Sequence, residues 1–285
     1  MIELLAWVTT RAARGLDEDE PIALAALQRT GVVVDVVDWD DPNVNWSRFD
    51  RVVLRSAWDY PERLPEFLSW LDMVDAVSDL VNPPAIVRWS LDKQYLAAIA
   101  NAGLPITPTR FESPGSVATF PAGDFVIKPA IGAGSRDAAS YGADQHNAAE
   151  AHVARLHASG RVVLVQPFLE SIAIEGEWPM IFFDGRFSHA ANKRVTLPHA
   201  GVSESLFAAE TNAAHVATAE QIDVAQRVMD LVSGQLGTPT YGRVDLVRDD
   251  AGGFCVLEVE LNEPSLFLRY ADNSAVERLL DALLR

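Results

Sequence analysis

The chain has 285 residues, of which 49% are hydrophobic, and its formal net charge is −17. This length and apolar content allow a packed core divided among two or three subdomains. Because 23 basic residues stand against 40 acidic ones, the composition disfavours a nucleic-acid partner, which would need clustered Lys and Arg. No apolar run approaches the ~20 residues of a membrane helix, and the chain does not begin with a signal-peptide pattern, so we expect a cytoplasmic protein with no membrane association.

The first 86 residues alternate strand and helix signals. We expect strands at 2–8, 32–37 and 52–54, and helices at 21–30 and 65–77. Strands separated by helices indicate a parallel sheet with covered faces. Two prolines after Asn82 interrupt regular structure and mark the end of a first domain, 1–86.

A central domain, 87–165, opens with a helix that Ser90 would cap and Gly103 would end. In chain order we expect this helix, a strand, a loop of small residues, a second helix and a second strand, at 91–102, 125–128, 131–137, 148–159 and 161–165.

The last domain, 166–285, is predicted to hold four strands and a helix, at 180–183, 186–191, 241–248, 254–261 and 219–236. Asp184-Gly185 between two apolar runs predicts a tight hairpin. The segment 197–214 shows no periodicity and is interpreted as a mobile functional loop or as disordered. The only cysteine, Cys255, lies in an apolar run without a nearby His and acid, which favours a buried strand residue over a catalytic thiol.

Acidic side chains on the last two strands carry the most chemical information. Glu258, Glu260 and Asn262 share one strand face, because side chains alternate between faces. Arg243 and Asp245 share a face of the preceding strand, and hairpin pairing can bring Asp245 beside Glu258. Two glutamates this close in an apolar strand need a cation, and hard oxygen ligands suit Mg²⁺ or Mn²⁺. The alternative is a solvated strand face with scattered ion pairs.

Isolated cations lie at the ends of predicted elements. Lys93, Lys128 and Lys193 fit the neutralisation of phosphate groups, although each alone also fits an ordinary surface charge. The loop at 131–137 could bring backbone N–H groups close to phosphate oxygens, or be a bare surface loop. No stretch matches the P-loop pattern.

Several phrases, taken in order, resemble the ATP-grasp superfamily. They lie at 92–93, 127–129, 163–170, 242–245 and 257–260, and the similarity extends over roughly residues 90–268. Four more phrases, at 9–15, 54–60, 87–93 and 263–267, resemble the O-ureido-D-serine cyclo-ligase (D-cycloserine synthetase) group. The resemblance implies an α/β chain with the α+β ATP-grasp fold. In it, a Rossmann-like, substrate-binding domain would precede two α+β subdomains that enclose ATP.

The resemblance also implies a role for each matching residue. The phosphates of ATP would be contacted by Lys93 and Lys128 and covered by a loop with Gly132, Gly134 and Ser135. The adenine would lie at a hinge formed by Gln166, Pro167, Phe168 and Leu169, and the ribose would bind Glu177. The catalytic cations would be Lys193 and Arg243, and the metal would be held by Asp245, Glu258 and Glu260. The separation of Asp245 and Glu258 matches the Asp and Glu of D-alanine–D-alanine ligase-like members, which puts Glu260 where they have Asn. A register two residues later would instead pair Glu260 with Asn262.

The implied reaction forms ADP and an acyl phosphate, which a nitrogen nucleophile attacks. The partners would be ATP and a small amino-acid-like carboxylate, and a homodimer is compatible with the sequence. A substrate carboxylate needs a cation, and an amine needs a polar group. The candidates are Arg11, Arg14, Arg55 and Arg194 for the carboxylate, and Asp59 and Tyr60 for the amine; alternatively, these residues hold the domains together.

Three other functions remain open. A glutathione-synthetase-like or dipeptide-forming ligase would need a second substrate. A nucleotide-binding protein without catalysis is disfavoured because Arg243, Asp245, Glu258 and the lysines are all present. A ligase that extends a polypeptide tail is disfavoured because no docking segment is evident in an acidic chain.

Overall fold

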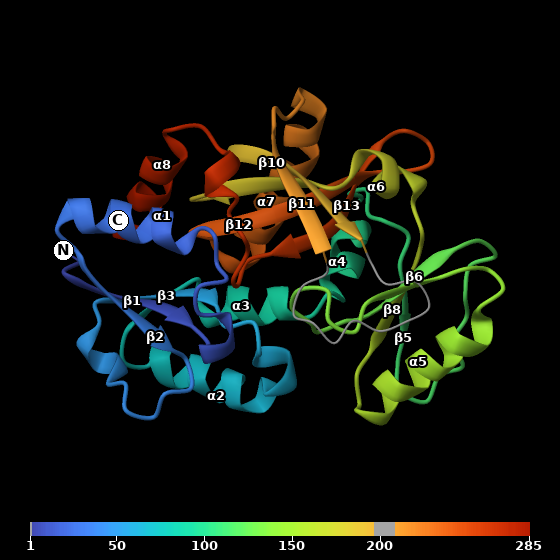
Figure 1. Cartoon of the computed structure of the whole chain (residues 1–285), viewed down its shortest axis with the longest axis horizontal. Helices are drawn as coiled ribbons and strands as arrows, with labels where there is room; N and C mark the ends of the chain where they lie inside the picture. Colours follow the sequence, from blue (N-terminus) through green and yellow to red (C-terminus); the bar gives the residue numbers. More distant parts are fainter. Residues whose placement is uncertain (1, 197–208) are drawn as a thin grey trace.

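The chain folds into three sheets with helices packed against them (Figure 1). The structure is a computed structural model and describes residues 2–196 and 209–285. Its strands are β1 (Leu4–Thr9), β2 (Val33–Asp38), β3 (Arg51–Ser56), β4 (Asp79–Val81), β5 (Arg110–Glu112), β6 (Phe125–Pro129), β7 (Ala139–Tyr141), β8 (Val163–Pro167), β9 (Trp178–Phe183), β10 (Arg186–Thr196), β11 (Ala209–His215), β12 (Tyr241–Arg248) and β13 (Phe254–Glu260). Its helices are α1 (Glu20–Thr30), α2 (Leu64–Asp75), α3 (Pro84–Leu91), α4 (Tyr95–Asn101), α5 (His146–Ala158), α6 (Glu170–Glu175), α7 (Ala219–Leu236) and α8 (Ala275–Leu284).

The N-terminal sheet is parallel, with strand order β2-β1-β3-β4, as the alternating strands and helices predict. Successive β1 side chains enter different cores: Trp7 packs with α1 and α8, whereas Val8 packs on the α2 side. Figure 1 shows the C-terminal helix α8 lying against α1. The end of the chain therefore completes the covering of the first sheet.

The two remaining sheets are antiparallel. The order in one is β5-β8-β6-β7, with α5 packed on it through an apolar cluster. The order in the other is β11-β10-β9-β12-β13, and α7 covers one of its faces. The helix predicted at 219–236 is confirmed, and it begins with a capping box in which Thr218 and Gln221 bond to each other's backbone N–H. The boundaries proposed after residues 86 and 165 remain predictions.

The prolines after Asn82 start a helix. Pro84 is the first residue of α3, where a missing N–H costs nothing and the fixed φ suits the helix. Ser90 therefore lies inside α3, and its prediction as an N-cap was wrong. Its buried hydroxyl accepts a hydrogen bond from the Leu261 N–H (2.9 Å) and donates to the Val259 carbonyl (3.3 Å), which fixes α3 to β13.

The helix predicted at 91–102 is interrupted between α3 and α4. The Asp92 carboxylate accepts from the Gln94 N–H at 3.0 Å, a local bond that competes with helix continuation. The Lys93 N–H donates to the Ala130 carbonyl at 3.0 Å. This break places Lys93 beside the segment that follows β6.

The predicted hairpins are confirmed, and each contains a bulge; in the first, Ser188 is the extra residue between the pairs Phe187–Phe182 and His189–Ile181. Asp184 and Gly185 both have positive φ, as the tight turn requires. Between β12 and β13, Asp245 pairs with Glu258, and then Leu246 pairs with Val256, so Leu257 is an extra residue. Leu257 packs on the apolar cluster of Leu169, Val247 and Cys255, whereas Val259 belongs to the main core, although simple alternation would place both on one face.

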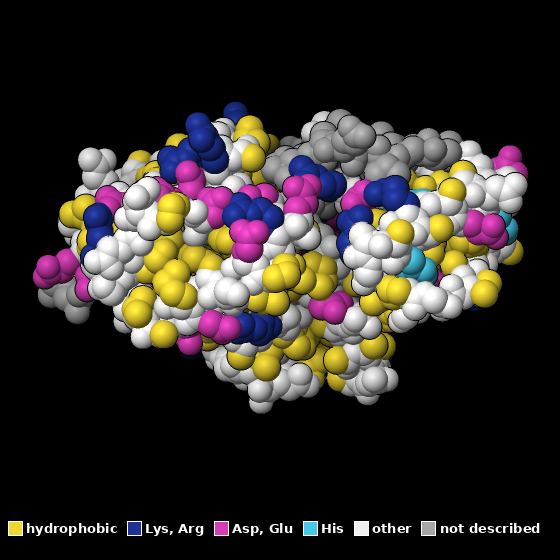
Figure 2. All heavy atoms as spheres, turned by 90° about the horizontal axis from the view of Figure 1, so that it is seen from below, with side chains coloured by type: hydrophobic (Ala, Val, Ile, Leu, Met, Phe, Trp, Pro, Cys, Tyr) yellow, Lys and Arg dark blue, Asp and Glu magenta, His cyan; other side chains and the backbone are white. Residues whose placement is uncertain are grey.

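The segment predicted to lack regular structure, 197–214, is in part a strand. β11 pairs antiparallel with β10, from Ala190 opposite His215 to Thr196 opposite Ala209. The prediction was therefore wrong for residues 209–214, and 197–208 lie outside the described residues. In the described part of the chain, no helix is long and apolar enough to cross a membrane. On the face drawn in Figure 2, Lys and Arg side chains lie among Asp and Glu side chains.

Candidate active site

A cavity of about 650 Å³ is lined by residues of all three sheets and of the loops between them. This volume is in the range of small-molecule sites. Sixteen of the residues predicted to bind or react line it: Tyr60, Lys93, Lys128, Gly132, Gly134, Ser135, Gln166, Pro167, Phe168, Leu169, Glu177, Lys193, Arg194, Arg243, Glu258 and Glu260. The structure thus brings together groups that are up to 200 residues apart in sequence, from Tyr60 to Glu260.

One charge cluster joins β13 to the two lysines of the central region. The Lys93 ammonium lies 3.0 Å from the Glu258 carboxylate, and the Lys128 ammonium lies 3.9 Å from it. Burial would raise the pKa of Glu258, but the charges of Lys93 and Lys128 outweigh it and lower the pKa to about 2. Glu258 is therefore an anion that holds two cations at the cavity wall.

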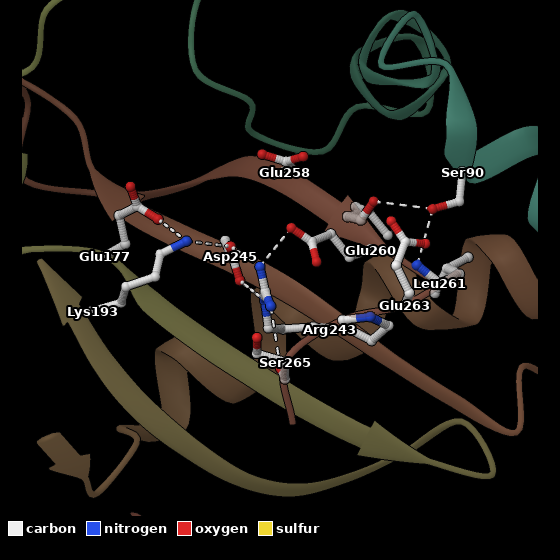
Figure 3. Close-up of polar contacts among 12 residues, drawn as sticks. Ser90, Glu177, Lys193, Arg243, Asp245, Glu258, Glu260, Leu261, Glu263 and Ser265 are labelled. Atoms are coloured by element: carbon white, nitrogen blue, oxygen red, sulfur yellow. Dashed lines mark hydrogen bonds and ion pairs between the residues drawn. The ribbon is translucent and has the colours of Figure 1, made fainter. Parts of the chain in front are cut away.

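A second cluster lies along β10, β12 and β13 (Figure 3). Lys193 bonds to Glu177 at 2.7 Å and to Asp245 at 3.3 Å. Arg243 donates to both oxygens of Asp245, at 2.7 and 3.0 Å, and to Glu260 at 2.6 Å. These pairs form a continuous alternation of charge across the floor of the cavity.

Crowding of acids is visible in the pKa of Glu260, which rises to about 7. Burial is the largest cause, and the charges of Glu258 and Asp245 add to it, while Arg243 opposes it. A cation placed among these carboxylates would relieve that repulsion.

The β12–β13 hairpin sets this geometry. Arg243 pairs with Glu260 and Asp245 with Glu258, so all four side chains are placed by one ladder. At Gly242, an added Cβ would lie 2.5 Å from the Leu261 side chain, which explains a residue without a side chain there.

The small-residue loop is fixed at both ends. The Gly132 carbonyl accepts from the Lys93 ammonium at 3.1 Å and from the Tyr60 hydroxyl at 3.5 Å. Farther along, Asp137 pairs with Arg155 at 2.8 Å and with Arg161 at 2.6 Å. Gly134 and Asp137 have positive φ, so the loop turns sharply between these anchors.

The predicted hinge, 166–169, begins within the last two residues of β8. The Phe168 N–H donates to the Asp124 carbonyl at 2.8 Å, and the Gln166 amide donates to the Thr109 hydroxyl at 2.8 Å. These bonds fix 166–169 at the cavity wall, with Phe168 partly exposed. Their assignment to adenine remains a proposal.

Four predicted substrate residues do not reach the cavity. Arg11 is exposed near the N-terminal sheet, and Arg14 pairs with Asp38 on the surface. Asp59 accepts from the Trp39 indole N–H at 2.8 Å. Local partners thus hold Arg14 and Asp59 outside the lining of the cavity, and a substrate role for these residues stays a prediction.

Arg55 is the fourth, and it is buried between domains. Its guanidinium donates to the Pro264 carbonyl at 2.7 Å and lies over the rings of Trp7 and Tyr241. Asp17 and Asp19 lie 3.9 and 3.8 Å away. These contacts support the alternative that Arg55 holds the domains together.

Several cavity residues escaped the sequence analysis. Trp58, Glu263, Ser265 and Phe267 line the cavity near Arg243 and Tyr60. They lie in the sequence motifs at 54–60 and 263–267, which indicated the family resemblance but to which, apart from Arg55, Asp59 and Tyr60, no site role was assigned. Burial and the charge of Glu260 raise the pKa of Glu263 to about 8.

Comparison with known proteins identifies the family of this chain. Residues 5–82 match the family model for the N-terminal domain of the D-cycloserine synthetase DcsG. The cycloserine biosynthesis protein DcsG of Streptomyces lavendulae is 39% identical over 291 residues, which cover 96% of this chain and 95% of that protein.

Solved structures give the same result. The crystal structure of D-cycloserine synthetase DcsG has a TM-score of 0.87 at 38% identity and covers 98% of each chain. The ATP-grasp ligase PsnB, in complex with a variant of its minimal precursor, Mg and ADP, has a TM-score of 0.63 at 19% identity over 99% of each chain and shares the fold. The chain therefore belongs to the D-cycloserine synthetase family of ATP-grasp ligases and is an ATP-dependent ligase that forms ADP.

Proposed function

We propose that this ligase takes one amino-acid substrate, an O-substituted D-serine such as O-ureido-D-serine, and closes it into a ring such as that of D-cycloserine. The observation that carries the proposal is the 39% identity to DcsG over 96% of the chain. Ring closure would use a nucleophile in the same molecule as the activated carboxylate, which gives a high effective concentration.

The described side chains support phosphoryl transfer followed by acyl transfer. Lys93 and Lys128 present two ammonium groups beside the glycine loop, where they would bind the phosphates of ATP. Arg243 lies at the wall with its guanidinium fixed by Asp245 and Glu260, so it is oriented to stabilise negative charge on the reacting phosphate or acyl oxygen. In ring closure of an O-ureido substrate, the nitrogen bonded to the side-chain oxygen would attack the acyl carbon and displace phosphate, and water would remove the carbamoyl group as carbon dioxide and ammonia.

The donor set fits Mg²⁺ or Mn²⁺. Asp245, Glu258 and Glu260 offer hard carboxylate oxygens, and the buried Asn262 Oδ1 has no hydrogen-bond partner. In the described residues no three such side chains are gathered tightly enough to hold a metal together, because lysine and arginine partners hold them. When bound, the metal would neutralise phosphate charge, and Glu258 and Glu260, with Asp245 or Asn262, would hold it.

The proposal is tested by measuring ADP release with O-ureido-D-serine, its L-enantiomer and other O-substituted serines, each with ATP and Mg²⁺ and no second amine. We expect ADP release only with the D-compound, and a product whose mass is that of the expected ring. ADP release that appears only after a separate amine is added would show a two-substrate ligase instead.

A further inference from the structure

Glu263 differs in its partners from the acids closest to it along the β12–β13 hairpin and beside β9. Glu177, Asp245, Glu258 and Glu260 each lie within ion-pair distance of a lysine or arginine. Glu263 lines the same cavity, yet no cation of residues 2–196 and 209–285 lies within 4.0 Å of its carboxylate.

The two cations whose charges act most on Glu263 are Lys93 and Arg55, and both already bond to other groups. Lys93 bonds to Glu258 at 3.0 Å and to the Gly132 carbonyl at 3.1 Å. Arg55 donates to the Pro264 carbonyl at 2.7 Å. Neither is therefore free to turn to Glu263 without leaving another buried group unpaired.

One oxygen of this carboxylate is shut off from solvent without compensation. Glu263 Oε2 is buried and has no hydrogen-bond partner among the described residues. A buried polar oxygen left unpaired costs roughly 1–3 kcal/mol. Such a group inside a ligand cavity points to a donor on the ligand.

Glu263 is placed where the reacting end of a substrate would lie. It follows β13 directly, three residues after Glu260, which shares Arg243 with Asp245 (Figure 3). The Trp58 indole N–H reaches the Glu263 carbonyl at 3.4 Å, so the N-terminal domain closes this end of the cavity. The predicted hinge at 166–169 belongs to the sheet on the other side of the molecule (Figure 1).

We propose that Glu263 binds the α-ammonium group of the amino-acid substrate, with Trp58 and Tyr60 as the aromatic wall beside it. This inference rests on the proposed function. In an α-amino acid the ammonium and the carboxylate leave the same carbon, so the groups that recognise them must be neighbours. Glu263 and Arg243 both line the cavity, on either side of Glu260 (Figure 3), and aromatic faces add to the attraction for a cation.

The test compares Glu263→Gln with the wild type and with Glu150→Gln, which removes an exposed acid from α5. Losing the charge pair should raise the KM for the amino acid about 10²-fold in Glu263→Gln. The KM for ATP should stay within about twofold, because the phosphate-binding lysines are untouched. Glu150→Gln should match the wild type in both.

A substrate analogue without the α-amino group separates binding from a structural role. The wild type should prefer the amino acid over this analogue by about 10²-fold in kcat/KM, and Glu263→Gln should lose most of that preference. Glu263→Asp, which keeps the charge, should restore part of it. If Glu263→Gln folds poorly, the preference for the amino acid over the analogue can still be compared between the wild type and Glu263→Asp, and this comparison tests whether the carboxylate binds the ammonium group.

Two failures are distinguishable. A wild-type enzyme that releases no ADP with any amino acid contradicts the proposed function. An active wild type whose Glu263→Gln variant keeps both its KM and its preference for the amino compound overturns this inference alone. The same holds if the wild type itself does not discriminate, since Glu263 would then serve as a neutral hydrogen-bonding group.

Discussion

Two buried arginines, Arg55 and Arg243, look alike in sequence but differ in their surroundings. Each lies on a strand, and their side chains are 2% and 4% exposed, so burial alone does not separate them. The acids near Arg55, Asp17 and Asp19, are 3% and 4% exposed, whereas Glu260 beside Arg243 is 32% exposed.

The two arginines differ in whether their acidic partners face a closed core or the open cavity. Around Arg55, aromatic rings and a carbonyl close the site, and the guanidinium joins the N-terminal sheet to β12 and to the segment after β13. Of the two acid partners of Arg243, Asp245 is 2% exposed, but Glu260 borders the cavity, so the charge of Glu260 can be taken over by a ligand. A buried ion pair thus indicates function only when its partners open onto a cavity.

Replacing each arginine with methionine should separate the two roles most strongly. Arg243→Met should lower kcat by about 10³-fold, because an oriented charge at the reacting group is lost. Steady-state kinetics per folded molecule would measure this, with Arg55→Met as the matched control expected to keep kcat within about threefold. Equal losses in both variants would contradict the comparison.

The next largest effect is expected at Glu258, which holds two lysines on the cavity side. Glu258→Gln should lower turnover by at least about 10²-fold, since the proposed metal loses a charged ligand and Lys93 and Lys128 lose their counter-charge. Circular dichroism and the urea midpoint should show a folded protein. Near-normal activity would remove Glu258 from the proposed metal site.

Arg55→Met should act on stability. Removing one partner from a buried charge cluster costs about 3–5 kcal/mol, and here it leaves Asp17 and Asp19 without compensation. Urea unfolding measures the loss. If stability is unchanged and the KM for the amino acid rises instead, Arg55 is the substrate ligand that the sequence suggested.

These arginines show what the sequence could provide. Strand alternation and hairpin pairing predicted that Arg243, Asp245 and the two glutamates would meet, because those rules act between neighbouring strands. The partners of Arg55 lie in the segment before α1, in β1 and after β13. Contacts between segments so far apart in sequence leave no local pattern of residues from which they could be predicted. The assignment of Arg55 to substrate binding therefore stays a prediction, while its observed contacts join the N-terminal sheet to β12 and to the segment after β13.

The same limit applies to the fold. The long amphipathic helix at 219–236 and the strands of the last hairpin were predicted because their periodicity is extended. The short elements β4, β5, β7 and α6 were missed, since three to six residues carry little periodicity. Glu263 was missed as a site residue because only the closing of the cavity by Trp58 shows its burial.

The smallest effect concerns the seam, by which we mean Arg55, Asp19 and the contact of Asp19 with Leu266; the Leu266 N–H donates to Asp19 at 2.5 Å, and its carbonyl faces His189. His189 donates its Nε2–H to the Leu266 carbonyl at 2.7 Å, and its Nδ1 accepts from the Ser188 hydroxyl at 2.9 Å. The Ser188 oxygen in turn accepts from Arg278 at 2.8 Å. The neutral imidazole is thus satisfied, and burial lowers the pKa of His189 to about 4.

The sign follows from proton binding. An unfolded chain has a histidine pKa of about 6.5, so between that pH and about 4 the unfolded state binds more protons, and stability falls as the pH falls. On going from pH 7 to pH 5, the wild type should lose about 2 kcal/mol more of its unfolding free energy than His189→Gln, whose amide keeps one donor and one acceptor. Urea unfolding at both pH values measures the difference, and His152, whose pKa is also lowered to about 4, is present in both proteins and cancels. Identical pH dependence in the two proteins would mean that the imidazole at this seam can charge freely. The contrast between a closed seam and an open cavity would then need another basis.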